Sequence, residues 1–134
     1  MKALAKLPKT LVIDRARWLR GDGDGKLLDE NGKMCCLGFL SRAIGYAPRE
    51  IRYKLDPTGI VRARPSKRAL RFGALLAWPD KDDPGRPSRS VVCDLLVHTN
   101  DDAGMSDRAR EARIERLFAR VGVKVRFVGE TVKP

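Results

Sequence analysis

The clearest hydrophobic pattern in the chain lies between residues 106 and 122. Apolar side chains recur there at intervals of three and four residues, which predicts an amphipathic helix. Ser106 or Asp107 is suited to cap the start of this helix, and Gly122 to end it. From residue 123 to residue 129 apolar and cationic side chains alternate, which predicts a half-exposed strand. The apolar positions of the helix are Ile114, Leu117, Phe118 and Val121.

A second apolar segment, residues 34 to 44, is hydrophobic nearly all round and predicts an enclosed helix that Gly45 ends. Just before it, Asn31-Gly32 predicts a tight turn between the arms of a hairpin over residues 27 to 34. Other helices are predicted over residues 91 to 98 and, as a short turn with a proline near its start, over residues 47 to 51. Residues 11 to 19 carry apolar side chains at helical spacing, and they predict a short amphipathic helix anchored by a tryptophan.

The middle of the chain is interrupted by prolines and glycines. Residues 56 to 59 predict a turn, and residues 60 to 64 predict a brief strand that Pro65 ends or places at an edge. Ser66 is suited to cap a helix over residues 67 to 76. Residues 79 to 89 are typical of a loop.

These elements predict an α+β fold in which about four short helices pack on a small antiparallel sheet, built from the hairpin and the final strand. The chain has 134 residues and no internal repeat, and we expect residues 1–134 to form a single domain that buries roughly two-thirds of its unfolded surface. No apolar run approaches the ~20 residues that cross a bilayer, and the first residues lack the apolar stretch of a signal peptide. We therefore expect a cytoplasmic protein without membrane contact.

The formal net charge of +11 is concentrated in the middle of the chain, where residues 35 to 72 include nine lysines and arginines against two acidic residues. A charge of this sign and size attracts polyanions, so nucleic acid is the first partner to consider. The competing explanation is a solvated surface that keeps the protein soluble. The candidate nucleic-acid-binding residues are Arg62, Arg64, Lys67, Arg68 and Arg71, which Arg42, Arg49 and Arg52 can join, and arginines recur on the last helix at Arg110, Arg113 and Arg120.

Aromatic side chains near this basic segment are few. They are Tyr46, Tyr53, Phe72 and Trp78. Because proteins that bind single strands stack bases on aromatic rings, the composition supports that mode of recognition only weakly.

The three cysteines, Cys35, Cys36 and Cys93, form neither a disulfide framework nor a paired metal-binding motif. A thiol enzyme would need one of the adjacent pair as its nucleophile, His98 as its base and a following aspartate to orient that base. The opposing interpretation is that Cys36 is a small buried hydrophobic residue. We expect this second role, and we expect no catalytic residue, no metal and no cofactor.

A polar cluster follows the predicted helix over residues 91 to 98. Its members, Asn100, Asp101, Asp102 and Asp107, could hold magnesium for a nuclease-like reaction. The simpler interpretation is that Asn100 and Asp101 bond the backbone of their own turn and that the carboxylates favour the N-terminus of the next helix. We expect the simpler role.

Two stretches of the chain resemble a known group of proteins. The chain is similar there to small phage- and prophage-encoded proteins that have a Cys-Cys-Leu-Gly helix, a downstream Asn-Asp turn and a last amphipathic helix. The resemblance covers about half of the chain, which departs from the pattern in its basic, proline-broken middle and in Asp102. The matching residues are Trp18, Gly21, Leu27, Leu28, Asp29, Gly32 and the run Met34-Cys35-Cys36-Leu37-Gly38-Phe39, then Thr99-Asn100-Asp101, Ile114 and Phe118.

The resemblance implies a phage or mobile-element origin, and small proteins of this origin often inhibit host defence nucleases or bind nucleic acid. We therefore expect a non-enzymatic protein that binds nucleic acid, or a host complex that contains it, through a basic patch in the host cytoplasm. The alternative is a protein-binding inhibitor of a host defence or replication enzyme, of the anti-CRISPR or anti-restriction type. A thiol-dependent or metal-dependent enzyme comes third.

Replacing Arg62, Arg64 and Arg68 together with Ala should weaken binding to a short duplex and leave the melting temperature unchanged. Solvated arginines neutralise phosphates, whereas they contribute little to packing. Fluorescence anisotropy and a thermal melt of the same samples measure the two effects. A large fall in melting temperature would instead place these arginines in the fold.

Overall fold

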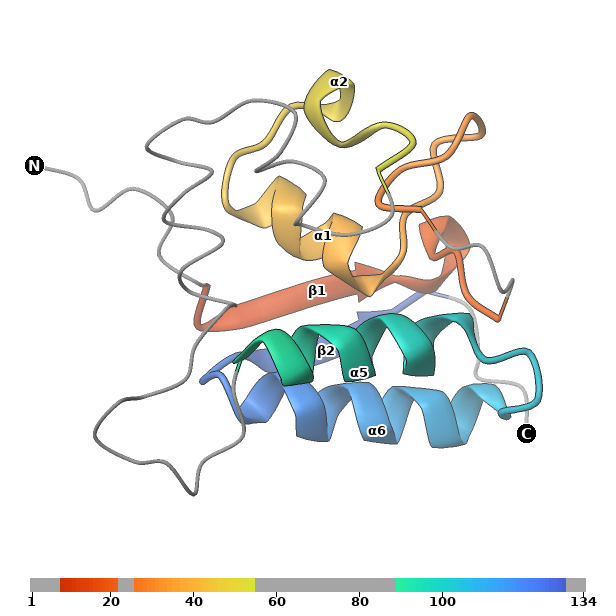
Figure 1. Cartoon of the computed structure of the whole chain (residues 1–134), viewed down its shortest axis with the longest axis vertical. Helices are drawn as coiled ribbons and strands as arrows, with labels where there is room; N and C mark the ends of the chain where they lie inside the picture. Colours follow the sequence, from red (N-terminus) through yellow and green to blue (C-terminus); the bar gives the residue numbers. More distant parts are fainter. Residues whose placement is uncertain (1–7, 22–25, 55–88, 130–134) are drawn as a thin grey trace, which may run out of the picture.

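The structure is a computed structural model that describes residues 8–21, 26–54 and 89–129. Within these ranges the architecture is α+β, with helices packed around a small sheet (Figure 1). The predicted turn, strand and helix between residues 56 and 76, and nearly all of the predicted loop after them, lie outside the described residues. The described elements are β1 (Thr10–Asp14), the 3-10 helix η1 (Arg15–Arg17), α1 (Cys36–Ala43), α2 (Pro48–Ile51), α5 (Arg89–Asp101), α6 (Asp107–Ala119) and β2 (Lys124–Val128).

The sheet formed by the described residues has two strands, β1 and β2, which run parallel with residues 10–14 opposite residues 124–128. The predicted final strand is confirmed, but the predicted antiparallel sheet is wrong. The predicted hairpin over residues 27–34 contributes no strand to this sheet, because its two arms contact other segments. The sheet therefore joins segments from opposite ends of the chain.

The strand β1 replaces the helix predicted over residues 11–19. Leu11 and Ile13 are buried and Val12 between them is exposed, so burial alternates with the period of a strand. In a segment this short, the apolar spacing fits a helix face and an alternating strand alike, and β-branched side chains favour the strand. Pairing with β2 decides between them.

The predicted turn at Asn31-Gly32 is confirmed. Only the glycine of the pair has a positive φ, of 77°, and the Asp29 carboxylate closes the turn by accepting hydrogen bonds from the backbone N–H groups of Asn31 and Lys33, both at 2.9 Å. Backbone hydrogen bonds from the N–H of Asp29 to the oxygen of Lys33 (2.9 Å) and from the N–H of Cys35 to the oxygen of Lys26 (3.1 Å) join the two arms. Each arm also forms an isolated bridge to another segment, Leu28 with Arg52 and Met34 with Trp18.

Helix α1 confirms the predicted enclosed helix, and a glycine sets how closely it packs. A Cβ atom added at Gly38 would lie 1.9 Å from the backbone oxygen of Leu27, far inside van der Waals contact. Only glycine therefore lets α1 lie directly against the segment before the turn. The buried residues of α1 are Cys36, Leu37, Gly38, Leu40 and Ser41.

Figure 1 shows α5 and α6 side by side in opposite directions, with β1 between this pair and α1. The last predicted helix is confirmed as α6: the Ser106 hydroxyl accepts from the N–H of Ala109 at 3.2 Å, and Gly122 follows with a φ of 81°. Helix α5 continues to Asp101, beyond its predicted end at His98. Among the described residues, no helix is long and apolar enough to cross a membrane.

Asn100, in the last turn of α5, is fully buried and uses every hydrogen-bonding position of its amide. Its Oδ1 accepts from the indole Nε1 of Trp18 at 2.7 Å and from the backbone N of Cys36 at 3.0 Å. Its Nδ2 donates to the backbone oxygen of Leu19 at 2.8 Å and to Asp101 Oδ1 at 3.1 Å. The prediction that Asn100 bonds its own turn is therefore wrong, because its main partners lie in the N-terminal segment and in α1.

Replacing Asn100 with Ala should lower the free energy of unfolding by about 3 kcal/mol or more, because two buried N–H groups and the part-buried Leu19 oxygen lose their partner, and an unsatisfied buried group costs about 1–3 kcal/mol. Urea denaturation measures the change. The control is Asn31→Ala at an exposed turn, which should change the free energy of unfolding by well under half of that amount. Equal effects of the two substitutions would contradict the central role of Asn100.

Candidate nucleic-acid interface

The five residues predicted to bind nucleic acid, Arg62, Arg64, Lys67, Arg68 and Arg71, lie outside the described residues. The neighbouring part of the predicted basic surface is described. Its three arginines, Arg42, Arg49 and Arg52, are exposed and belong to α1, α2 and the residue after α2. Arg42 donates from its guanidinium to the backbone oxygen of Tyr46 at 2.8 Å, and this hydrogen bond stabilises the chain just after α1.

A different set of arginines points inward and is held by carboxylates. Arg15 donates from Nε and Nη2 to the two oxygens of Glu111, both at 2.9 Å, and this hydrogen bonding raises the pKa of Arg15. Arg20 pairs with Asp107 at 3.2 Å, and its guanidinium lies 4.8 Å from the ring centre of Trp18. These pairs fasten the segment after β1 to α6.

Arg110 was predicted as one of the basic surface positions of the last helix, and this prediction is wrong. The residue is only 2% exposed, pairs with Asp107 at 2.6 Å and donates to the backbone oxygens of Thr99, Asp102 and Met105. The sequence contains a signal for this, because Arg110 lies four residues before Ile114 and so falls on the apolar face of the helix. Its guanidinium fastens the loop between α5 and α6.

The solvent-exposed surface of α6 carries a row of arginines, Arg113, Arg116 and Arg120, which we call the arginine stripe. Spacings of three and four residues place them on one side of the helix over about 10 Å. Among the described residues, none of the three arginine side chains has an ion pair or a hydrogen-bond partner. Sequence reasoning named Arg113 and Arg120 and missed Arg116, although its spacing from both indicates the same side.

The surface of α6 around the stripe includes exposed alanines, whose short side chains leave space beside the guanidinium groups. The neighbouring strand β2 carries two exposed cations, of which Lys124 shares a hollow with the exposed carboxylate Glu115 of α6. Such a surface can approach a polyanion closely. The alanines are Ala109, Ala112 and Ala119, and the β2 cations are Lys124 and Arg126.

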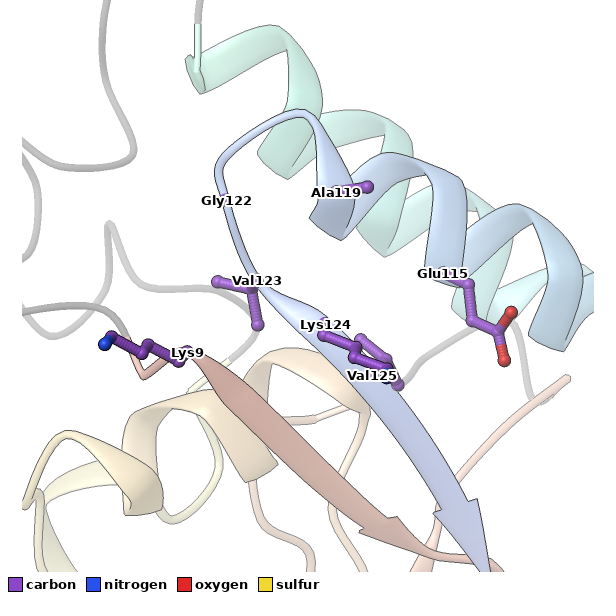
Figure 2. Close-up of a pocket in the computed structure, with 7 residues that line it drawn as sticks. All are labelled: Lys9, Glu115, Ala119, Gly122, Val123, Lys124 and Val125. Atoms are coloured by element: carbon purple, nitrogen blue, oxygen red, sulfur yellow. The ribbon is translucent and has the colours of Figure 1, made fainter.

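Two hollows in the described part of the surface are also basic. One, of about 380 Å³, lies where α6 passes β2 on the side away from β1, and its charged lining is Lys9, Lys124 and Glu115 (Figure 2). The other, of about 520 Å³, is lined by three cations and one carboxylate. Two of these cations, Arg15 and Arg20, already pair with carboxylates, so this hollow has less free positive charge than its lining suggests.

The cysteines are placed for packing. Cys35 and Cys36 are both buried and neither is in a disulfide bond within the described residues, and the Cys36 thiol lies 3.9 Å from the backbone oxygen of Leu96. Burial raises the pKa of Cys35 to about 12, which keeps it as a neutral thiol near pH 7, the opposite of what a nucleophile needs. His98 is exposed on α5, and the side chain of Cys93 is not among those described.

The residues of the predicted polar cluster, Asn100, Asp101, Asp102 and Asp107, make different contacts and do not form one site. The residue that bonds its own turn is Asp102, which accepts from the N–H of Gly104 at 2.8 Å, and not Asn100 or Asp101 as predicted. Asp107 lies in the first turn of α6, where a carboxylate is favourable, and pairs with two arginines. Among the side chains that the structure describes, no three of histidine, cysteine, aspartate and glutamate lie close enough together to hold a metal ion.

The aromatic residues considered for base stacking differ in exposure. Tyr46 is 2% exposed and cannot stack on a base, whereas Tyr53 is 56% exposed. Phe72 and Trp78 lie outside the described residues. Lys26 lies over the Tyr53 ring, 5.6 Å from its centre, a tertiary contact that the sequence spacing did not indicate.

Comparison with known proteins gives no match to a family model, to a curated protein or to a solved structure. The similarity to phage-encoded proteins therefore remains an expectation that depends on the motif residues. Those residues are nevertheless brought together: Trp18, Cys36 and Asn100 share one hydrogen-bonded cluster, and Gly21 lies against the guanidinium of Arg110.

Cys35 and Cys36 should resist iodoacetamide in the folded protein between pH 7 and 9 and react fully in urea. Because the folded state holds the Cys35 proton more tightly than the unfolded state, the contribution of this thiol to stability is complete below pH 9.0 and is lost as the pH rises toward about 12. Mass spectrometry of the tryptic peptide over residues 34–42, which contains both cysteines, measures the modification. Rapid alkylation of this peptide in the folded protein would revive the thiol-enzyme hypothesis.

Proposed function

We propose that this chain is a non-enzymatic nucleic-acid-binding protein of phage or mobile-element origin that acts in the host cytoplasm. The arginine stripe of α6 supplies phosphate contacts, and the basic residues in the middle of the chain supply further ones. The observation that carries the proposal is the contrast between the inward-pointing Arg15, Arg20 and Arg110 and the exposed row of arginines in the stripe. The inward set pairs with carboxylates, and the stripe has no partner within the described residues.

The physical argument starts from what each set does for the fold. Arg15 and Arg20 bridge segments that are distant in the chain, and Arg110 holds the loop between α5 and α6, so the charges of all three are used in folding. The stripe bridges nothing among the described residues and leaves its guanidinium groups available for bidentate bonds to phosphate. Each phosphate contact releases condensed counterions, which favours binding at low salt.

The thiol-enzyme alternative is opposed by the raised pKa of Cys35, which removes the thiolate at neutral pH. An acidic groove of a host enzyme would also complement the stripe, so a protein-binding inhibitor remains the second candidate. The two differ in their expected partner, because a protein groove offers carboxylates instead of a phosphate backbone. Direct binding to purified nucleic acid separates them.

The double variant Arg113→Gln/Arg116→Gln should weaken binding to a short DNA duplex and to its separated strands. Each lost phosphate contact reduces the slope of log K against log salt by about 0.9 on the duplex, so the variant should lower that slope by roughly 2. Fluorescence anisotropy at salt concentrations between about 50 and 200 mM measures the slope.

The matched control is Arg17→Gln/Lys33→Gln, which removes the same charge from η1 and the turn at residues 29–33. This control should keep the wild-type slope within about 0.5. Equal losses in both variants would show that net charge, and not the stripe, is responsible. Absence of salt-dependent binding to any oligonucleotide would overturn the proposed function and favour the inhibitor.

A further inference from the structure

Tyr53 has a backbone conformation that tyrosine rarely adopts. Its φ is +62°, and it is the one residue other than glycine with a positive φ in the described ranges. In this region the Cβ atom of an L-residue crowds the backbone, so a bulky side chain there is an outlier that needs an explanation. Glycine would adopt the same conformation without this cost.

The surrounding backbone explains why the conformation is held. The N–H of Tyr53 donates to the backbone oxygen of Leu28 at 2.9 Å, and the N–H of Leu27 donates to the oxygen of Lys54 at 2.7 Å. Ile51, two residues earlier, is fully buried and fixes the end of α2. These contacts constrain the main chain at position 53, and none of them uses the tyrosine ring.

The ring itself contributes little to the core, because Tyr53 is 56% exposed. The fold therefore requires the backbone shape at this position and not the aromatic side chain. A strained, exposed aromatic residue that the core does not use is a candidate for binding, since strain of this kind gathers at functional sites.

One cation lies over the ring, and others are close to Tyr53 in the chain. Lys26 lies 5.6 Å from its centre, Arg52 precedes it and is exposed, and Arg49 is exposed one helical turn earlier on α2. Arg52 and Lys54 flank Tyr53 in the chain, so positive charge lies on both sides of it. An aromatic face among cations is the composition of surfaces that bind single-stranded nucleic acid, where the ring stacks on a base and the cations contact phosphates.

From this arrangement we infer that Tyr53 is a stacking platform for one base of a single-stranded nucleic acid, with Lys26 and Arg52 as its phosphate contacts. The inference rests on the proposed function and adds the strandedness of the ligand. A base inside a duplex already stacks on both neighbours, so an exposed ring gains a new stacking contact only from an unpaired base. Recognition of this kind tolerates any sequence, because every base has a flat face.

The test distinguishes binding through the Tyr53 ring from binding through the positive charges. Wild-type protein is titrated with a ten-nucleotide single strand and with an abasic strand of equal length, which keeps the phosphates and lacks the bases. The wild type should bind the strand with bases about 5- to 150-fold more tightly, the range expected for one stacked base.

Two substitutions complete the test. Tyr53→Gly removes the ring and the strain together, so its melting temperature should equal or exceed that of the wild type, and its preference for the strand with bases should fall at least about fivefold. Tyr53→Phe keeps the aromatic face and should retain the preference. A lower melting temperature for Tyr53→Gly would show that the ring serves the fold and would overturn the inference.

The outcomes distinguish this inference from the proposed function. If the wild type binds both strands equally, with a salt dependence that Arg113→Gln/Arg116→Gln reduces, the proposed function stands and the stacking role of Tyr53 is wrong. If Tyr53→Gly keeps the full preference of the wild type, stacking occurs elsewhere and the inference is likewise overturned. If no oligonucleotide binds at any salt concentration, both fail, and an exposed contact with a protein partner becomes the better explanation of the ring.

Discussion

The amide of Asn100 is the constraint on which the described structure depends. A helix leaves its first N–H groups without partners, and α1 has no side-chain cap of its own at Cys35. Asn100 supplies the missing acceptor from α5, 64 residues away in the chain, and the same oxygen accepts from Trp18. The position of α1 is thereby tied to that of α5 and to the segment after β1. The close contact of Gly38 with Leu27 then sets how α1 packs on the preceding segment.

The positive charges of the described residues fall into a paired inner group and an unpaired outer group. Glu111 and Asp107 of α6 form ion pairs with arginines that hold loops in place, so the charges of those arginines are neutralised within the fold. The surplus lies on the outer side of α6 and around α2. In the proposed function these two outer regions have different tasks, since the stripe gives affinity for phosphate and Tyr53 gives a reason to prefer unpaired bases. A uniform solvated surface would require neither the clustering nor the strained aromatic residue.

Several features of this fold could be predicted from the sequence, and the reasons for the failures are physical. The helices α1 and α6 and the turn at Gly32 were predicted correctly, because hydrophobic period and turn chemistry are local. The direction of the sheet was not, because the pairing of β1 with β2 is decided by tertiary packing that no local pattern encodes. The buried role of Arg110 was missed because a count of charge ignores the helix face on which the charge lies. The contact of Lys26 with Tyr53 depends on how α2 is placed beside the segment at 26–28, and spacing in the sequence gives no indication of it.

The parallel pairing of β1 with β2 has a consequence for how the chain reaches its structure. Residues 10–14 pair with residues 124–128, which are separated from them by nearly the whole chain. The N-terminus of α1 likewise gains its acceptor only when α5 has packed beside it. Contacts between residues so far apart raise the contact order, which slows folding and leaves few stable partial structures along the way. Folding of this domain should therefore be a single cooperative event that is slow for its size, in which neither half can complete its hydrogen bonds without the other.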